Sequence, residues 1–227
     1  MAIALPGNAM DLIGETIEYA LLHQQELWQA LIRHLELVGV ALAVAIVVCI
    51  PLGIWTSRSR AAAATVINAF NTLRVIPSLA VLFLAIPYFG LSFTSAAIAL
   101  TLLALPPILV NTDTAFRNID PAIREAATGM GMSPGQILRQ VEIPLALPIV
   151  LVGIRTAATE VIASATLAAF IGSGGLGRFV VLGFGMFDSA ILLAGAVPVA
   201  LLTLLAEAGL GALQRLAEPP GLTAGHL

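Results

Sequence analysis

Long uncharged stretches dominate the hydrophobic pattern of this chain and predict helices that cross a membrane. A helix needs about 20 apolar residues to span the hydrocarbon core of a bilayer. Residues 37–57 carry no charge and make a first span. The uncharged run 75–112 is too long for one helix, and a Gly-Leu-Ser sequence at 90–92 divides it. We therefore expect a second span that ends near Phe89 and a third that starts near Thr94.

The remaining spans follow from the same pattern. The second helix is expected to begin near Ala62, ahead of the uncharged run. A fourth span covers residues 147–171, and a fifth covers 189–205, where the apolar pattern can continue to residue 216. Because five spans are an odd number, the two ends of the chain are predicted to lie on opposite sides of the membrane.

The region before the first span has a different pattern. In residues 11–34 apolar residues recur at helical spacing, with Glu15, Glu18 and Glu26 between them. This predicts an amphipathic helix at the membrane interface; a helix docked on the bundle is the alternative. A cleaved signal is not expected, because the apolar start, 1–6, is too short.

Composition supports lipid as the solvent of much of the chain. Of its 227 residues, 59% are hydrophobic and 10% charged, and the mean hydropathy is +1.01. A soluble domain of this length cannot hide so much apolar surface. Aromatic residues make up only 6%, which favours packed helices over a β-barrel with aromatic girdles. The predicted fold is an all-α integral membrane protein of about five transmembrane helices plus the N-terminal amphipathic helix. Its regions are 1–34, a transmembrane domain 35–217 and a tail 218–227.

Charge and cysteine content exclude several classes of partner. The formal net charge of −3 is too small to indicate a nucleic-acid partner. Cys49 is the single cysteine and lies in an apolar run, so it supports neither a disulfide framework nor a metal cluster and is expected to be a small core residue.

The arginines indicate which side of the membrane is cytoplasmic, because positive charge accumulates in cytoplasmic loops. If the N-terminus is outside, the loops after spans one, three and five fall on one side, and they carry Arg58, Arg60, Arg117, Arg124, Arg139 and Arg215. The loops of the other side carry only Arg33 and Arg178. The cytoplasmic face is therefore predicted to carry residues 113–146, with the N-terminus outside and the C-terminus in the cytoplasm.

Residues 113–146 form an unusually polar connection for a membrane protein. The segment carries Asp113, Arg117, Asp120, Arg124, Glu125, Arg139 and Glu142. Pro121 is expected to open a helix that Asp120 caps, and Ser133 to cap a second helix that Pro134 opens. Glycines at 129 and 131 separate the two helices, and Pro144 is expected to stop the second. Two short helices joined by a glycine turn make a knob that suits docking to a soluble partner.

Within this knob lies a recognisable motif. Glu125-Ala126-Ala127, three residues, Gly131, nine residues and then Val141-Glu142-Ile143-Pro144 resembles the EAA signature of ABC-importer permeases. That signature reads EAA, three residues, Gly, nine residues and Ile-x-Leu-Pro, so Val141 and Ile143 exchange one aliphatic residue for another. An ordinary connecting helix pair is the alternative interpretation.

The resemblance implies a mechanism and a set of partners. In the family this loop is the coupling helix that sits in a groove of the nucleotide-binding subunit. The implied coupling residues are Arg124, Glu125, Ala126, Ala127, Gly131, Ile143 and Pro144. The small residues would permit close approach, and Arg124 and Glu125 would supply polar contacts.

The same resemblance implies a bacterial inner-membrane protein that works in a complex. Its partners would be an ABC ATPase dimer that binds ATP and Mg²⁺, a second copy of this permease or a homologous one, and a substrate-binding protein. The chain has no phosphate loop with Gly-Lys-Ser/Thr, so we expect no enzymatic activity and no cofactor of its own.

The resemblance extends from about residue 34 to 216 and is strongest to permeases for osmoprotectants such as glycine betaine, carnitine and choline. The stretches that carry it are 76–80, 105–112, 120–122, 129–132, 153–157, 165–168 and 171–177. Methionine permeases share several of these patterns. A permease for methionine or another amino-acid-like solute is therefore the alternative.

Residues 172–177 formally match GxGxxG. A dinucleotide site would need this motif between a strand and a helix, whereas here it follows a membrane span on the outer side. We expect an outer turn ahead of a short helix near 178–184. The turn either contacts a substrate-delivery protein or only reverses the chain.

Arg155 and Glu160 are charges inside the fourth span. Such charges are costly and usually face the bundle interior or a wet path, so both are candidates for the translocation path. Arg155 belongs to a family-like stretch, and a structural role at the inner end of the bundle is the favoured explanation for it. Glu160 departs from the family pattern; it would attract a quaternary ammonium, or else be a buried pair or a protonated acid.

Two other functions fit the sequence less well. An intramembrane enzyme would use Glu160, Asp113 or His34, but their spacing implies no catalytic pair and no metal constellation. A stand-alone secondary carrier would leave the knob of residues 125–144 unexplained.

Overall fold

The computed structural model describes residues 9–73 and 75–218, and these residues form helices and turns. The predicted all-α membrane fold is confirmed. The elements are α1 (Ala9–Leu22), α2 (Gln24–Ser57), α3 (Arg60–Leu73), α4 (Ser78–Phe89), α5 (Phe93–Arg117), α6 (Pro121–Gly129), α7 (Pro134–Ile137), a π-helical turn η1 (Leu138–Glu142), α8 (Ile143–Ala165), a 3₁₀ turn η2 (Leu167–Ile171), α9 (Gly177–Met186) and α10 (Ser189–Ala217).

Within residues 9–73 and 75–218, four helical stretches are long and apolar enough to cross a membrane, namely α2, α5, α10 and the continuous run of α7, η1 and α8. The second predicted span is not a single helix. It divides into α3 and α4, with Pro77 in an extended conformation (φ −56°, ψ 135°) just before α4. A proline lacks the backbone N–H and disfavours helical geometry at the preceding residue, which accounts for the break.

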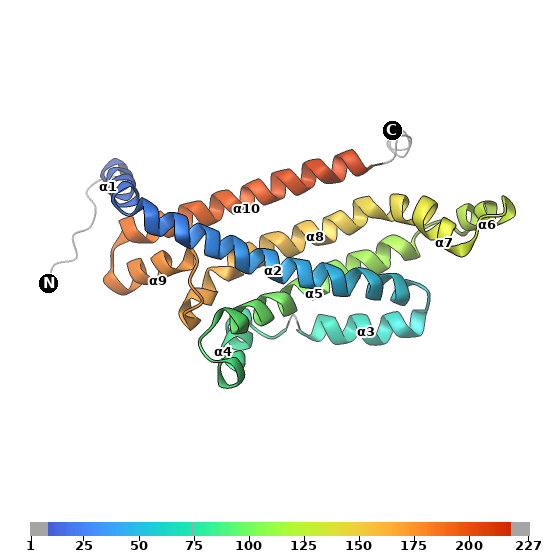
Figure 1. Ribbon diagram of the computed structural model, residues 1–227, viewed down its shortest axis with the longest axis horizontal. Helices are drawn as coiled ribbons and strands as arrows, with labels where there is room; N and C mark the ends of the chain where they lie inside the picture. Colours follow the sequence, from blue (N-terminus) through green and yellow to red (C-terminus); the bar gives the residue numbers. More distant parts are fainter. Residues whose placement is uncertain (1–8, 74, 219–227) are drawn as a thin grey trace.

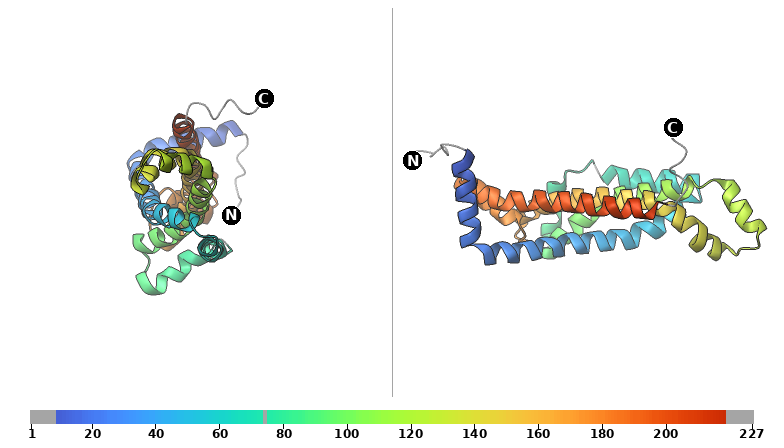
Figure 2. Two further views of the ribbon diagram at one scale, coloured as in Figure 1. Left: turned by 90° about the vertical axis from the view of Figure 1, so that its right-hand side faces the viewer. Right: turned by 90° about the horizontal axis from the view of Figure 1, so that it is seen from above.

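The long helices run along one axis, and α3 lies alongside them (Figure 1). α1 and α9 lie at one end of this axis, whereas α6 and α7 project beyond the other end (Figure 1). The last turns of α10 point toward the α6 end. α1 crosses the bundle at a steep angle to the long helices (Figure 2, right).

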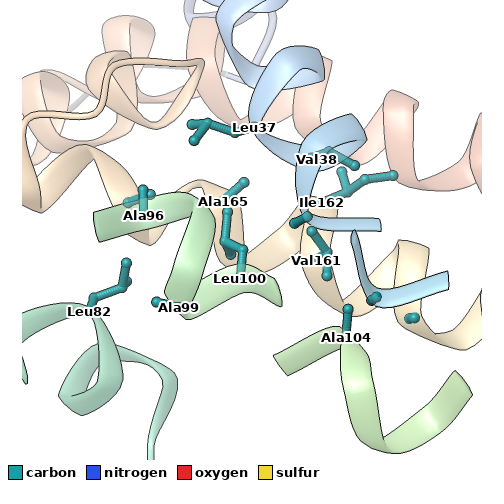
Figure 3. Packing of buried hydrophobic residues seen from close by; sticks show 14 of the residues in the cluster. Leu37, Val38, Leu82, Ala96, Ala99, Leu100, Ala104, Val161, Ile162 and Ala165 are labelled. Atoms are coloured by element: carbon teal, nitrogen blue, oxygen red, sulfur yellow. The ribbon is translucent and has the colours of Figure 1, made fainter. Parts of the chain in front are cut away.

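α5 is the central helix and packs against both α2 and α8. Leu37 of α2, Leu100 of α5 and Val161 of α8 converge in the core (Figure 3). Two glycines allow these helices to approach closely. A Cβ on Gly53 would lie 2.6 Å from the Cβ of Thr112, and one on Gly153 would lie 2.8 Å from the carbonyl oxygen of Pro107. Small residues at crossings are the usual basis of helix packing in lipid.

The N-terminal region combines features of both interpretations offered for it. The helical pattern of 11–34 is divided at His23, so that α1 is separate and α2 continues from Gln24 through the first span. α1 contacts α10, yet Ile13, Ile17 and Leu21 of α1 are each more than half exposed. The expected boundary between residues 34 and 35 lies inside α2, and residues 1–8 and 219–227 lie outside the described part.

Cys49 behaves as the predicted core residue. It is fully buried, and its Sγ lies 3.3 Å from the carbonyl oxygen of Leu105 on α5, to which it donates a hydrogen bond.

Candidate functional site

The two knob helices begin as the sequence predicts. The Asp120 carboxylate accepts a hydrogen bond of 2.8 Å from the backbone N–H of Ala122, and Pro121 occupies the first turn of α6. Ser133 and Gln136 form a reciprocal capping box at the start of α7. Such caps satisfy backbone donors that have no partner within the helix. Between the helices, Gly131 has a φ of +80°, a conformation that favours glycine.

The prediction that Pro144 stops the second helix is wrong. Helical structure continues from α7 through η1 into α8, and Pro144 lies in the first turn of α8. The physical reason is the π-helical turn η1, where the N–H of Ile143 bonds to the carbonyl of Leu138, five residues earlier. This wider turn precedes the proline, which cannot donate a hydrogen bond of its own.

Glu142, at the end of this π-helical turn, is the most deeply buried charged side chain of the knob. Its side chain is 2% exposed, and it is held by two arginines. Arg58, at the C-cap of α2, donates through Nη1 and Nη2 to the two carboxylate oxygens at 2.9 and 2.5 Å. Arg124 of α6 donates through Nε at 2.6 Å. Bidentate guanidinium–carboxylate pairs are among the strongest and most directional polar contacts in proteins.

Arg124 also reaches the end of α5. Its Nη2 donates to the carbonyl oxygen of Phe116 at 2.6 Å, and its Nη1 donates to that of Ile119 at 3.3 Å. Carbonyls in the last turn of a helix lack intrahelical donors, so a guanidinium is a suitable partner for them. Arg124, Arg58 and Glu142 therefore join α2, the end of α5, α6 and the base of α8. We call these three residues the Glu142 clamp.

A second ion pair lies beside the clamp. Arg117 donates to both carboxylate oxygens of Asp113 one turn earlier on α5, at 3.0 and 2.8 Å. Its Nη2 also donates to the carbonyl oxygen of Thr56 on α2 at 2.8 Å. This pair ties α5 to α2 but does not involve α6.

The motif residues fall into an outward and an inward set. Glu125 and Ala126 of α6, Gly131, and Ile143 and Pro144 at the base of α8 are exposed. Ala127 is buried, and Arg124 points inward to the clamp, although the sequence suggested an outward polar contact for it.

From the sequence, Arg58 stood out only as a basic loop residue and Glu142 only as part of the knob and its motif, and neither as a partner of the other. One signal was available, because Glu142 is the only charged residue between Arg139 and Arg155. Its partner Arg58 lies 84 residues away, and nothing in the local pattern points to it.

The charged groups of the membrane helices have a different arrangement. Arg155 of α8 faces Glu207 of α10, with Nε and Oε1 3.4 Å apart, and the two side chains are 30% and 49% exposed. Glu160, five residues further along α8, is half-buried. Arg155 and Glu160 thus lie on one helix, but the partner of Arg155 comes from α10.

At the opposite end of the bundle, the glycine turn packs onto α2. Gly172, Gly174 and Gly175 all have positive φ, and the Ser173 hydroxyl is buried and donates to the carbonyl oxygen of Ala168. A Cβ on Gly175 would lie 3.3 Å from Nδ1 of the buried His34. The turn therefore has a packing role, and α9 follows it close to the predicted position.

A protein-family model described as the binding-protein-dependent transport system inner membrane component matches residues 49–219. The chain is 40% identical over 195 residues to the carnitine transport permease protein OpuCB of Listeria monocytogenes, covering 86% of this chain and 88% of that protein. It is 39% identical over 213 residues to the osmoprotectant import permease protein OsmW of Salmonella typhimurium, covering 92% and 99%. It is 36% identical over 190 residues to the choline transport system permease protein OpuBB of Bacillus subtilis, covering 84% and 88%.

Among solved structures, the fold is similar to a chain of the MetNI methionine ABC transporter in an inward-facing conformation. The TM-score is 0.77 at 22% identity, and the match covers 87% of this chain and 98% of that one. This likeness concerns the arrangement of the helices.

Proposed function

Because this chain belongs to the family of binding-protein-dependent transport system inner membrane components, we propose that it is the permease subunit of an ABC importer for osmoprotectants such as glycine betaine, carnitine or choline. The observation that carries the proposal is the projecting α6, which displays Glu125 and Ala126 beyond the end of the membrane helices (Figure 1). A projecting helix pair of this kind offers a soluble subunit a surface to bind.

In this proposal an ATPase dimer binds the knob on the cytoplasmic side and holds ATP with Mg²⁺. The surface offered to it is small and sterically open, since Ala126 is exposed and the site of a Cβ on Gly131 has no neighbour within 4 Å. Glu125 supplies a charge, and the exposed Met130 an adaptable apolar contact. Two permease chains would enclose the substrate path, and a substrate-binding protein would dock at the opposite end, near α1 and α9.

The substrate class is supported by the relatives, whose names specify carnitine, choline or osmoprotectants. These solutes carry a quaternary ammonium or are zwitterions, and carboxylates on membrane helices suit such charge. We assign Glu160 on α8 and Glu207 on α10 to this purpose, and Arg155, which pairs with Glu207, to a substrate carboxylate. The chain has few aromatic residues, so high-affinity selection by an aromatic cage is assigned to the binding protein.

The proposal is tested by reconstituting the permease with its ATPase and binding protein in proteoliposomes. We expect uptake of radiolabelled glycine betaine, carnitine or choline that requires ATP and the binding protein. Methionine serves as the competing substrate. Uptake of methionine alone would overturn the osmoprotectant assignment, and ATP-independent uptake would overturn the importer assignment.

A further inference from the structure

We propose that Glu142 is the positioning residue that makes α6 and the inner ends of α2, α5 and α8 move as one body, so that motion of the bound ATPase reaches the substrate path. The inference rests on the proposed function for its biological meaning. Its structural content, that the Glu142 clamp joins the projecting knob to three membrane helices, is independent of the substrate.

The Glu142 carboxylate is deeply buried, and arginine donors bind both of its oxygens. The side chain is 2% exposed and receives three charge-assisted hydrogen bonds of 2.5 to 2.9 Å from Arg58 and Arg124. A buried charge is tolerated only when it is paired and hydrogen-bonded in good geometry. Removing the carboxylate would leave the guanidinium groups of Arg58 and Arg124 without their shared counter-ion.

The groups bonded in the clamp come from several elements. Arg58 caps α2, Arg124 belongs to α6, and Arg124 also binds the carbonyls of Phe116, in the last turn of α5, and of Ile119, just after α5. Glu142 itself continues directly into α8 through the π-helical turn. All of these elements therefore meet in the Glu142 clamp, whereas the neighbouring Arg117–Asp113 pair connects α5 and α2 and leaves α6 out.

The short helix α6 needs an anchor if it is to transmit force to the membrane helices. α6 has nine residues, which is too short to form a stable helix in isolation. Because α6 projects from the bundle, a force that the ATPase applies to its exposed face would bend the loop unless the opposite face of the helix is anchored. Arg124 lies next to the exposed Glu125 but points inward, and thus links the docking face to the clamp.

The test compares Glu142→Gln, which keeps the shape but removes the charge, with Arg139→Gln as matched control. Arg139 is an exposed residue of the same π-helical turn, so its variant also removes one charge there. Glu142→Asp retains the charge on a shorter stem and serves as the conservative variant. We expect substrate transported per ATP hydrolysed to fall at least about fivefold in Glu142→Gln, the lower end of usual coupling effects. It should be unchanged in Arg139→Gln and partly restored in Glu142→Asp.

A second readout needs no transport. Spin labels on cysteines introduced at Ser59, just after α2, and Thr128, on α6, report how firmly the knob is held, in a Cys49→Ala background. We expect one narrow distance in the parent and in Arg139→Gln, and a broadened distribution in Glu142→Gln. Arg124→Lys and Arg58→Lys keep the positive charge but lose the planar guanidinium group with its several donors. They supply the same comparison where Glu142→Gln is produced poorly.

These measurements separate failure of the inference from failure of the proposed function. A parent complex that transports no osmoprotectant would overturn the substrate assignment, while the distances would still judge the clamp. A narrow distance retained without the charge would overturn the clamp. Lower protein amounts with an unchanged transport-per-ATP ratio would also overturn it, because that result describes a role in folding alone.

Discussion

At the scale of the residue, position 131 needs a glycine because of its backbone conformation, not because neighbouring atoms leave no room for a side chain. Its φ of +80° is a conformation that other residues adopt at a cost, yet no atom lies within 4 Å of where a Cβ would stand. Gly129, two residues earlier, has equally open surroundings and ends α6 in helical geometry. Substitutions at these two glycines therefore distinguish the effect of backbone conformation from the effect of added side-chain volume within one loop.

We predict that Gly131→Ala impairs coupling, whereas Gly129→Ala leaves it intact. A left-handed alanine costs about 1–2 kcal/mol, which would shift the turn between α6 and α7 and the docking face with it. The measurement is ATP-dependent uptake together with copurification of the ATPase. Equal uptake in the two variants would show that the turn does not depend on its glycine conformation.

Gly153 illustrates the opposite requirement, because its surroundings leave no room for a side chain. A Cβ there would lie 2.7 Å from the Cβ of Asn111 and 2.8 Å from the carbonyl oxygen of Pro107. We predict that Gly153→Ala destabilises the protein by about 1–3 kcal/mol through overpacking at the α5–α8 crossing. Thermal unfolding in detergent checks this against Gly209→Ala, a helical glycine of α10 with open surroundings. Similar melting temperatures for the two variants would contradict the close helix approach.

At the scale of the element, local signals were sufficient where a helix is fixed by its own sequence. The caps at Asp120 and Ser133 act within three residues, and α10 follows from its continuous apolar pattern. Proline was ambiguous, because Pro77 precedes a new helix whereas Pro144 lies inside a continuous one. The difference at Pro144 is the π-helical turn before it.

The Glu142 clamp was beyond prediction from local pattern for another reason. Its members come from the C-cap of α2, from α6 and from the turn before α8, and they meet in the packed bundle, where α5 contacts both α2 and α8. The same holds for Arg155, whose partner Glu207 lies on α10. Sequence spacing identified Arg155 as a costly charge but gave no means of choosing a partner from another helix.

We predict that the Arg155–Glu207 pair stabilises the contact of α8 with α10. Arg155→Gln and Glu207→Gln should each lower thermal stability, and the double variant should lose less than the sum of the two. The expected coupling free energy is on the order of 0.5 kcal/mol, since both side chains are partly exposed. A double-mutant cycle on purified protein measures it. Strictly additive effects would exclude an interaction between the two side chains.

At the scale of the whole molecule, the two ends of the bundle carry different structures. One end has α1, α9 and the glycine turn, where Arg178 pairs with Glu26 and Arg33 pairs with Glu36. The other end has the knob and the Glu142 clamp. Arg58, Arg117, Arg124 and Arg139 gather at this second end, as the positive-inside rule expects of a cytoplasmic face.

This asymmetry leads to a prediction for the orientation of the protein in a cell membrane. Glu18 on α1 is exposed at one end of the bundle, whereas Thr128 on α6 is exposed at the other. Single cysteines at these two positions, in a Cys49→Ser background, should therefore react from opposite sides. We expect a membrane-impermeant maleimide to label the Glu18→Cys variant in intact cells and the Thr128→Cys variant only after permeabilisation.

The same experiment also decides where the chain ends relative to the knob. α10 runs toward the α6 end (Figure 1), so a cysteine at the exposed Glu218, just after α10, should behave like the one at Thr128. Labelling of Thr128→Cys in intact cells would place the knob outside, where no ATP-hydrolysing partner could act on it, and would exclude its role in coupling. Labelling of Glu18→Cys and Glu218→Cys from the same side would instead overturn the odd number of crossings, and the broken pair α3 and α4 would then be the segment that fails to span the bilayer.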